Sequence, residues 1–143
     1  MRGETLAILA AVLWGFAPIL DKFAISGGIS IYAANVVRVI GALMAILVAS
    51  LLTTQLDFSG IDVRKVAYLL AAGAIAGAIA MVLYYSALRS LGASKTVPLT
   101  AIYPMFTMIF WIFSIILLGE EVSLKLVVGT VLIIIGIILV SEV

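Results

Sequence analysis

Residues 66–88 read VAYLLAAGAIAGAIAMVLYYSAL and contain no charged side chain. At a rise of about 1.5 Å per residue, a helix of this length crosses the roughly 30 Å of hydrocarbon in a bilayer. The run lacks the strict alternation of a membrane barrel strand. An open strand in lipid would also leave its backbone polar groups unpaired. The stretch therefore predicts a membrane-spanning helix.

Four further apolar segments of similar length flank this one, at residues 5–26, 30–54, 95–118 and 122–141. The links between the five segments are short, so successive helices are expected to be antiparallel neighbours. We predict an all-α membrane protein in which residues 1–143 form one domain, a bundle of five transmembrane helices. Because Asp21 and Lys22 interrupt the first segment near its end, we expect it to remain a membrane helix rather than a cleaved signal peptide.

The composition excludes several classes of function. The chain of 143 residues is 66% hydrophobic and only 10% charged, with a mean hydropathy of +1.39, whereas a soluble domain is roughly a quarter charged. A net charge of +1 offers no basic patch for nucleic acid. The chain has no cysteine and no histidine, which removes disulfides, thiolate chemistry, Cys/His zinc sites and histidine-based catalysis. We expect no enzymatic activity, no metal and no cofactor, and we expect the lipid bilayer to be the main partner.

Landmark residues are distributed along all five segments in a characteristic order: Trp14-Gly15 with Pro18 and Lys22, Arg38, Tyr85-Ser86-Ala87-Leu88, Pro104, Gly119-Glu120, Gly129 and Gly136. Together they resemble one EamA domain of the drug/metabolite transporter superfamily, over essentially the whole chain. The resemblance implies transport of a small organic solute or metabolite. Members commonly have ten helices, built from two five-helix halves inserted in opposite orientations. This chain resembles one such half, as in the five-helix bacterial and archaeal branch.

The distribution of positive charges gives a weak orientation signal. Arg38 is intramembrane and is left out of the count. With a cytoplasmic N-terminus, four basic residues lie inside, namely Arg2, Arg64, Lys65 and Lys125, and three lie outside, namely Lys22, Arg89 and Lys95. Such balance is expected of a protein that inserts both ways round. Two opposed copies would reproduce the inverted repeat with which transporters build a midplane site. We therefore expect an antiparallel homodimer, the alternatives being a parallel dimer or a heterodimer with a separately encoded half.

Arg38 is the most informative single residue, because it lies about 12 Å along the second segment from Ser30. An ionised side chain at this depth is costly unless it is paired or hydrated. One interpretation is that Arg38 lines a central cavity and binds an anionic or carboxylate-bearing solute. The other is an ion pair with Asp21, at a similar depth in the first segment. The sequence leaves both open.

Asp21 is also the deepest acid, and with Lys22 it is our candidate for ion coupling or pairing. The remaining carboxylates fall at segment ends or in a loop, so none sits at the midplane, where proton-coupled carriers usually place a titratable group. The small multidrug resistance family, whose first helix carries a membrane glutamate, fits less well for the same reason. We expect exchange or facilitated movement.

Three aromatic residues, Trp14, Tyr103 and Trp111, lie near the middle of their segments. They either pack against helices and lipid or form a stacking wall for an organic solute. Tyr84 falls near a segment end, where interfacial anchoring is the ordinary role. Tyr85 points to a different face, turned inward, and joins Arg38, Trp14 and Tyr103 as a candidate solute contact.

Proline and glycine mark candidate bends and close contacts. Pro18 and Pro104 each remove a backbone donor inside a predicted helix, so each produces either a static kink or a hinge for alternating access. Gly73 and Gly77 form a GxxxG pattern that lets another helix approach closely, within the bundle or between two copies. Glu120 and Glu121 favour the positive dipole end of the last helix, which is a boundary role.

We predict a carrier in the cytoplasmic membrane that moves a small organic solute by alternating access, as a dimer of five-helix halves. The alternatives are a non-transporting subunit that stabilises a larger membrane complex, or a proton-coupled exporter of the small multidrug type. The scarcity of polar residues at mid-depth weighs against a passive pore.

Overall fold

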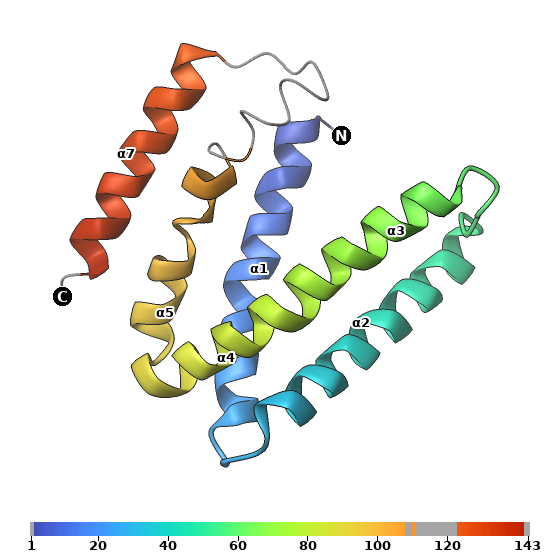
Figure 1. Ribbon diagram of the computed structural model, residues 1–143, viewed down its shortest axis with the longest axis horizontal. Coiled ribbons are helices and arrows are strands. Elements are labelled where there is room, and N and C mark those ends of the chain that lie inside the picture. The colour runs from blue at the N-terminus through green and yellow to red at the C-terminus, as the bar shows by residue number, and fades with distance from the viewer. Residues whose placement is uncertain (1, 108–109, 111–122, 142–143) are drawn as a thin grey trace. The chain divides into compact units, whose positions relative to one another are not determined.

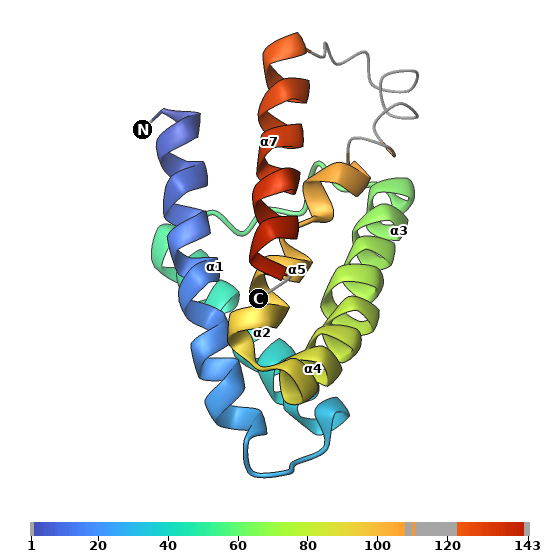
Figure 2. The ribbon, with the colours of Figure 1, turned by 90° about the vertical axis from the view of Figure 1, so that its left-hand side faces the viewer.

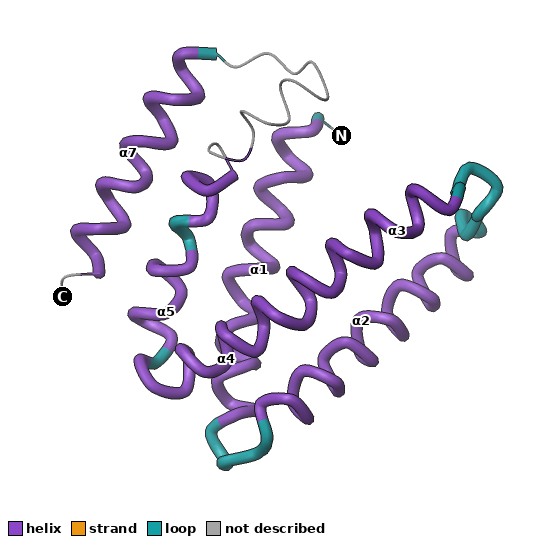
Figure 3. Tube along the Cα trace, viewed as in Figure 1, coloured by secondary structure: helices purple, strands orange, loops and turns teal. Residues whose placement is uncertain are grey.

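Helices account for all the regular secondary structure in the computed structural model, which describes residues 2–107, 110 and 123–141 (Figure 3). The prediction of an all-helical chain is confirmed for these residues. Predictions that concern Trp111, Gly119, Glu120 and Glu121 lie outside the described residues. The chain divides into two compact units, Met1–Ser90 and Leu91–Val143.

The first unit contains α1 (Gly3–Ile25), α2 (Ile31–Thr53), α3 (Val63–Ala72), the π-helix η1 (Gly73–Ile79) and α4 (Ala80–Leu91). The last three join end to end, so they form one continuous helix that returns alongside α2 (Figure 1). The end of α1 and the end of α4 meet near the loop that joins α1 to α2 (Figure 2). The predicted segments 5–26, 30–54 and 66–88 each lie within two or three residues of these bounds at both ends.

Local sequence explains where these helices begin and end. The Ser30 side chain accepts a hydrogen bond from the backbone N–H of Ala33 at the start of α2, and Asp62 does the same for Lys65 at the start of α3. Ser, Thr, Asp and Asn are the preferred residues for this capping role. At the other end of α2, Thr54 adopts the left-handed conformation, with φ of 52°, which stops the helix.

The π segment coincides with the sequence Gly-Ala-Ile-Ala-Gly-Ala-Ile at residues Gly73–Ile79. Glycine tolerates backbone distortion and stabilises an α-helix poorly. Two glycines within seven residues therefore weaken the α-helical preference at this point. Stretches of π-helix inside α-helices are rare and are frequently found at functional sites.

The second unit contains α5 (Ala93–Thr100), a helical stretch at 103–107, and α7 (Leu124–Ser141), with α5 packed against α7. Gly92, with φ of 79°, makes the single-residue link between α4 and α5. A turn at Ala101 and Ile102 interrupts the described part of the predicted helix 95–118. Pro104 explains this interruption, because it has no N–H to donate to the carbonyl of Thr100.

Three helical spans among the described residues are long and apolar enough to cross a membrane: Gly3–Ile25, Ile31–Thr53 and Val63–Leu91. In the first span, 6% of the most apolar part is buried inside the structure. In the other two spans, none of the corresponding part is buried. In water such large exposed apolar faces mark interaction surfaces or aggregation sites. These faces therefore contact lipid or further helices, and the chain is a multi-pass membrane protein.

Candidate functional site

The polar residues of the first unit gather around Asp21, in the last two turns of α1. The hydroxyl of Tyr85, on α4, donates a hydrogen bond to Asp21 Oδ1 at 2.6 Å. Tyr85 is turned inward, with 2% of its surface exposed. A short hydrogen bond from a hydroxyl to a carboxylate is among the stronger kinds in proteins. It joins α1 to α4 through two side chains that belong to different predicted helices.

Arg38 approaches the same carboxylate from α2. Its Nε lies 3.8 Å from Asp21 Oδ1, and the exposed fractions of the two side chains are 41% and 14%. The ion pair that the sequence left open is therefore present in the structure. Much of the guanidinium side chain remains accessible, so pairing with Asp21 and contact with a solute are compatible. Solute binding by Arg38 stays a prediction.

Lys22, the neighbour of Asp21, has a different partner. Its ammonium donates to the carbonyl oxygen of Leu88 at 3.0 Å. The last four carbonyls of a helix have no partner within the helix, and Leu88 is one of these in α4. Arg89 makes the reciprocal contact by donating to the carbonyl of Ile29, in the loop after α1. Both cations thus hold the ends of α1 and α4 together.

Asn35 is a functional candidate that our sequence reasoning missed. It lies one turn before Arg38 on α2, is 7% exposed, and its Nδ2 donates to the carbonyl oxygen of Gly77 at 2.9 Å. Gly77 belongs to the π segment, so a side chain of one span binds the irregular backbone of another. The signal available in the sequence was an amide side chain in an otherwise apolar span, three residues from a membrane arginine.

Tyr84 differs from its expected role as an interfacial anchor. Its hydroxyl is buried and has no hydrogen-bond partner among the described residues. The Tyr84 and Tyr85 rings lie 6.1 Å apart between centroids. Tyr84 also lies within electrostatic reach of Asp21 and Arg38. The structure therefore brings together Asp21, Arg38 and Tyr85 from the predicted set and adds Tyr84 and Asn35.

The other predicted aromatic contacts lie apart from this cluster or in the other unit. Trp14 is 69% exposed and lies seven residues before Asp21, on the same face of α1. Tyr103, which is 60% exposed, belongs to the second unit. Their roles as solute contacts remain predictions. So do the hinges at Pro18, which lies inside an uninterrupted α1, and at Pro104.

The glycines of the GxxxG pattern face open space. A Cβ atom added at Gly73 or Gly77 would meet no atom of another described element within 4 Å. Close packing inside the bundle therefore does not account for this pattern in the described residues. Contact between two copies stays a prediction.

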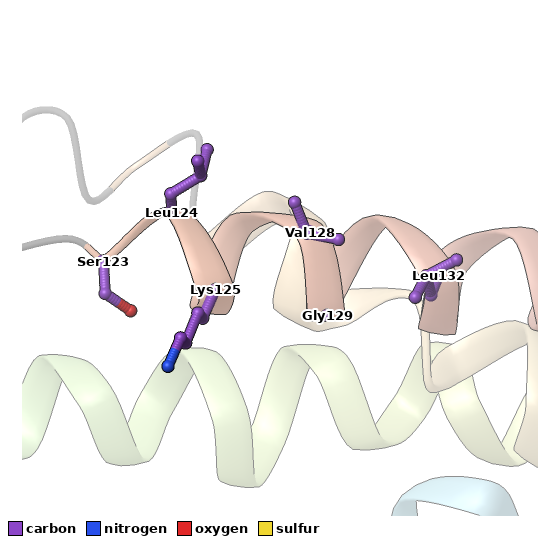
Figure 4. Close-up of a pocket in the computed structure, with 6 residues that line it drawn as sticks. All are labelled: Ser123, Leu124, Lys125, Val128, Gly129 and Leu132. Carbon is purple, nitrogen blue, oxygen red and sulfur yellow. The ribbon is translucent and has the colours of Figure 1, made fainter.

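A pocket of about 850 Å³ lies along the first half of α7 in the second unit (Figure 4). Its lining residues are Ser123, Leu124, Lys125, Val128, Gly129 and Leu132. Among these described lining residues Lys125 supplies the charge, and the other side chains are mostly aliphatic. None of the predicted solute contacts belongs to it.

The Asp21 cluster offers groups that can recognise a polar solute. It offers one carboxylate, one guanidinium, two phenols and an amide, with no cysteine or histidine in the whole chain. No group of three or more metal-binding side chains occurs in the described part of the chain. Such a set can bind and orient a polar solute inside an apolar helix assembly.

Comparison with known proteins gives a consistent result. A model of the EamA-like transporter family matches residues 1–142. A curated protein of Clostridium kluyveri, named an uncharacterized transporter, is 29% identical over 136 residues, which cover 94% of this chain and 42% of the relative. The chain thus spans less than half the length of that relative. No solved structure matches the chain.

Proposed function

Because the chain belongs to the EamA-like transporter family, we propose that it forms one half of a carrier that moves a small organic solute across the cytoplasmic membrane. The similarity to a protein named a transporter supports this activity. The family match covers both units, so the proposal concerns the chain as a whole.

The observation that carries the proposal is the Asp21–Arg38 pair within otherwise apolar spans. An ionised residue inside a membrane costs at least a few kcal/mol, and such residues usually line a substrate or ion pathway. A purely structural span has no need of this pair, because apolar residues of similar size often give equal or greater stability. Arg38 would attract an anionic or carboxylate-bearing solute, with Trp14, Tyr85 and Tyr103 as candidate contacts.

A second five-helix half would complete the carrier. The part of the Clostridium kluyveri relative outside the match is longer than the matched part, which leaves room there for a second segment of this size. The exposed apolar spans and the open faces of Gly73 and Gly77 favour a helical partner. The near-balanced positive charges favour an antiparallel copy, and a parallel copy or a separate half are the alternatives.

Transport would proceed by alternating access, in which the two halves rock around a shared site. Pro18 and Pro104 are the candidate bends. Since no carboxylate lies at the midplane, exchange or facilitated movement is favoured over proton coupling. A proton-coupled carrier would instead use Asp21, and only that version predicts uptake driven by a pH gradient alone.

The test is reconstitution of the purified chain in liposomes, followed by a screen of organic anions for saturable uptake. We expect Arg38→Gln to abolish uptake while the protein still assembles. Arg64→Gln is the matched control, because Arg64 is exposed near the start of α3. A purified protein without flux for any solute would favour the non-transporting subunit.

The orientation of the two halves needs a separate measurement. Reporters active on opposite sides of the membrane, fused to the C-terminus, should both be active if the chain inserts both ways round. Activity of one reporter alone would exclude the antiparallel homodimer. The parallel homodimer and the heterodimer with a separately encoded half would then remain.

A further inference from the structure

Two buried polar atoms of the first unit have no hydrogen-bond partner among the described residues. They are Oδ1 of Asn35 and the hydroxyl oxygen of Tyr84. Buried polar groups in proteins nearly always have a partner, so each exception calls for a cause such as a bound ligand. Asn35 is 93% buried, because only 7% of it is exposed.

The hydrogen bond between Asn35 and Gly77 identifies which atom of the Asn35 amide is unpaired. The Gly77 carbonyl can only accept a hydrogen bond, so the amide must present Nδ2 to it. That contact leaves Oδ1 pointing elsewhere as an unpaired acceptor. Whatever satisfies it must bring a donor.

Arg38 belongs to the same part of the first unit as the two unpaired atoms. Asn35 and Arg38 are three residues apart on α2, so their side chains project from the same face. Tyr84 follows Gly77, the partner of Asn35, by seven residues in the same continuous helix. Tyr84 is also within electrostatic reach of Arg38. The groups therefore share one region of the first unit.

The charges of this region favour an anion with a single charge. Arg38 and Lys22 contribute two positive charges, and Asp21 contributes one negative charge. Lys22 is occupied by the Leu88 carbonyl and the Tyr85 hydroxyl by Asp21. Arg38, about two-fifths exposed, keeps guanidinium donors for an incoming carboxylate.

We propose that Arg38, Asn35 and Tyr84 form a subsite for a small monocarboxylate that carries a hydroxyl group on the carbon next to its carboxylate. Arg38 binds the carboxylate, Asn35 Oδ1 accepts from the ligand hydroxyl, and the Tyr84 hydroxyl donates to the oxygen of that same ligand hydroxyl. This inference rests on the proposed function and deepens it by naming the class of solute. A hydroxyl fits better than an ammonium group, because the region is already positive.

Matched probes test the role of the hydroxyl. Lactate and propionate differ only in that group, and their binding to the purified full chain in lipid nanodiscs is measurable by calorimetry. We expect lactate to bind at least about five- to tenfold more tightly, which is the gain from a single net hydrogen bond, because its hydroxyl makes two such bonds in the subsite. Equal affinities, or tighter binding of alanine than of lactate, would overturn the proposal. Binding needs no flux, so this result is independent of the liposome assay.

Substitutions locate the subsite. Tyr84→Phe and Asn35→Leu should each weaken lactate binding about five- to tenfold and leave propionate binding nearly unchanged. Tyr68→Phe is the matched control, because Tyr68 is exposed on α3. Unchanged lactate affinity in both test variants would remove the subsite from this region.

Thermal stability separates a ligand site from a structural hydroxyl. If the Tyr84 hydroxyl awaits a ligand, then Tyr84→Phe without ligand should raise the melting temperature, since an unsatisfied polar atom is removed. Lactate should then stabilise the native chain more than the variant. A lower melting temperature for ligand-free Tyr84→Phe would show that the hydroxyl has a structural partner, and the proposal would fail.

Discussion

The ammonium of Lys22 donates a hydrogen bond to the carbonyl oxygen of Leu88 at 3.0 Å, which fastens the end of α1 to the last turn of α4. The contact satisfies a carbonyl that the helix itself leaves unpaired. It also places a positive charge at the negative end of the α4 dipole. Leu88 is fully buried, so water is poorly placed to replace the lysine.

Replacement of Lys22 by Met should therefore destabilise the folded chain by about 1.5–3 kcal/mol, the range for a hydrogen bond from a charged donor. Lys22→Arg keeps the charge and the donors and should restore most of this stability. Thermal unfolding in lipid nanodiscs would measure both. If Lys22→Met matched the native melting temperature, the contact would carry no net stability.

Loss of the Tyr85 hydroxyl should have a larger effect than loss of an exposed phenol. Tyr85→Phe removes the donor that binds Asp21 Oδ1 at 2.6 Å, and Asp21 is only 14% exposed. We expect a loss of about 1.5–3 kcal/mol in the free energy of unfolding. Tyr32→Phe, at an exposed position of α2, should change little. Equal melting temperatures for the two variants would contradict this account.

The spans of the first unit could be predicted from the sequence because hydropathy and length decide them. Charged residues interrupt the apolar runs at Arg64 and Arg89, near the bounds of the continuous helix Val63–Leu91. The π segment could not be predicted in the same way. Its residues are as apolar as their neighbours, and the Asn35 side chain that donates to its Gly77 carbonyl comes from another span.

The candidate site was predictable only in part. The depths of Asp21 and Arg38 follow from the rise of a helix, which is why their pairing appeared as an alternative. Rotation about the helix axis is harder to predict when nearly every face is apolar. Tyr84 illustrates this, because its place near a segment end suggested an anchor while its hydroxyl is buried. Pro104 could be predicted to bend the fourth segment, but whether it acts as a hinge depends on motion.

The open faces of Gly73 and Gly77 make a prediction about association. Gly73→Leu should leave the fold of a single copy intact, because a Cβ there meets nothing within 4 Å in the described residues. If the glycines contact a second copy, the larger side chain should weaken dimerisation by about fivefold or more, since overpacking a well-packed contact typically costs about 1–3 kcal/mol. Gly41→Leu is the control, at an equally open position of α2. Equal dimer fractions in cross-linking of the two variants would place the interface elsewhere.

The loop between α2 and α3 carries a carboxylate whose titration can be predicted. Asp57 accepts hydrogen bonds from the backbone N–H and the hydroxyl of Ser59, both at 2.8 Å. These bonds stabilise the ionised form and lower the pKa of Asp57 below its ordinary value. A carboxylate with a lowered pKa in the folded state contributes stability above its unfolded pKa. That contribution is lost as the pH falls through the folded value.

Ser59→Ala should therefore raise the pKa of Asp57 toward its ordinary value while leaving it below that value. The backbone N–H is the larger of the two contributions and is retained in the variant. Carbon-detected NMR of the side-chain carboxyl, followed from neutral to acidic pH, would measure the change, with Asp57→Asn to assign the signal. In the native chain the loop should loosen only at pH values below the ordinary pKa of aspartate. A fall in the pKa of Asp57 on removal of the Ser59 hydroxyl would contradict this assignment, because that hydroxyl would then be favouring the protonated form.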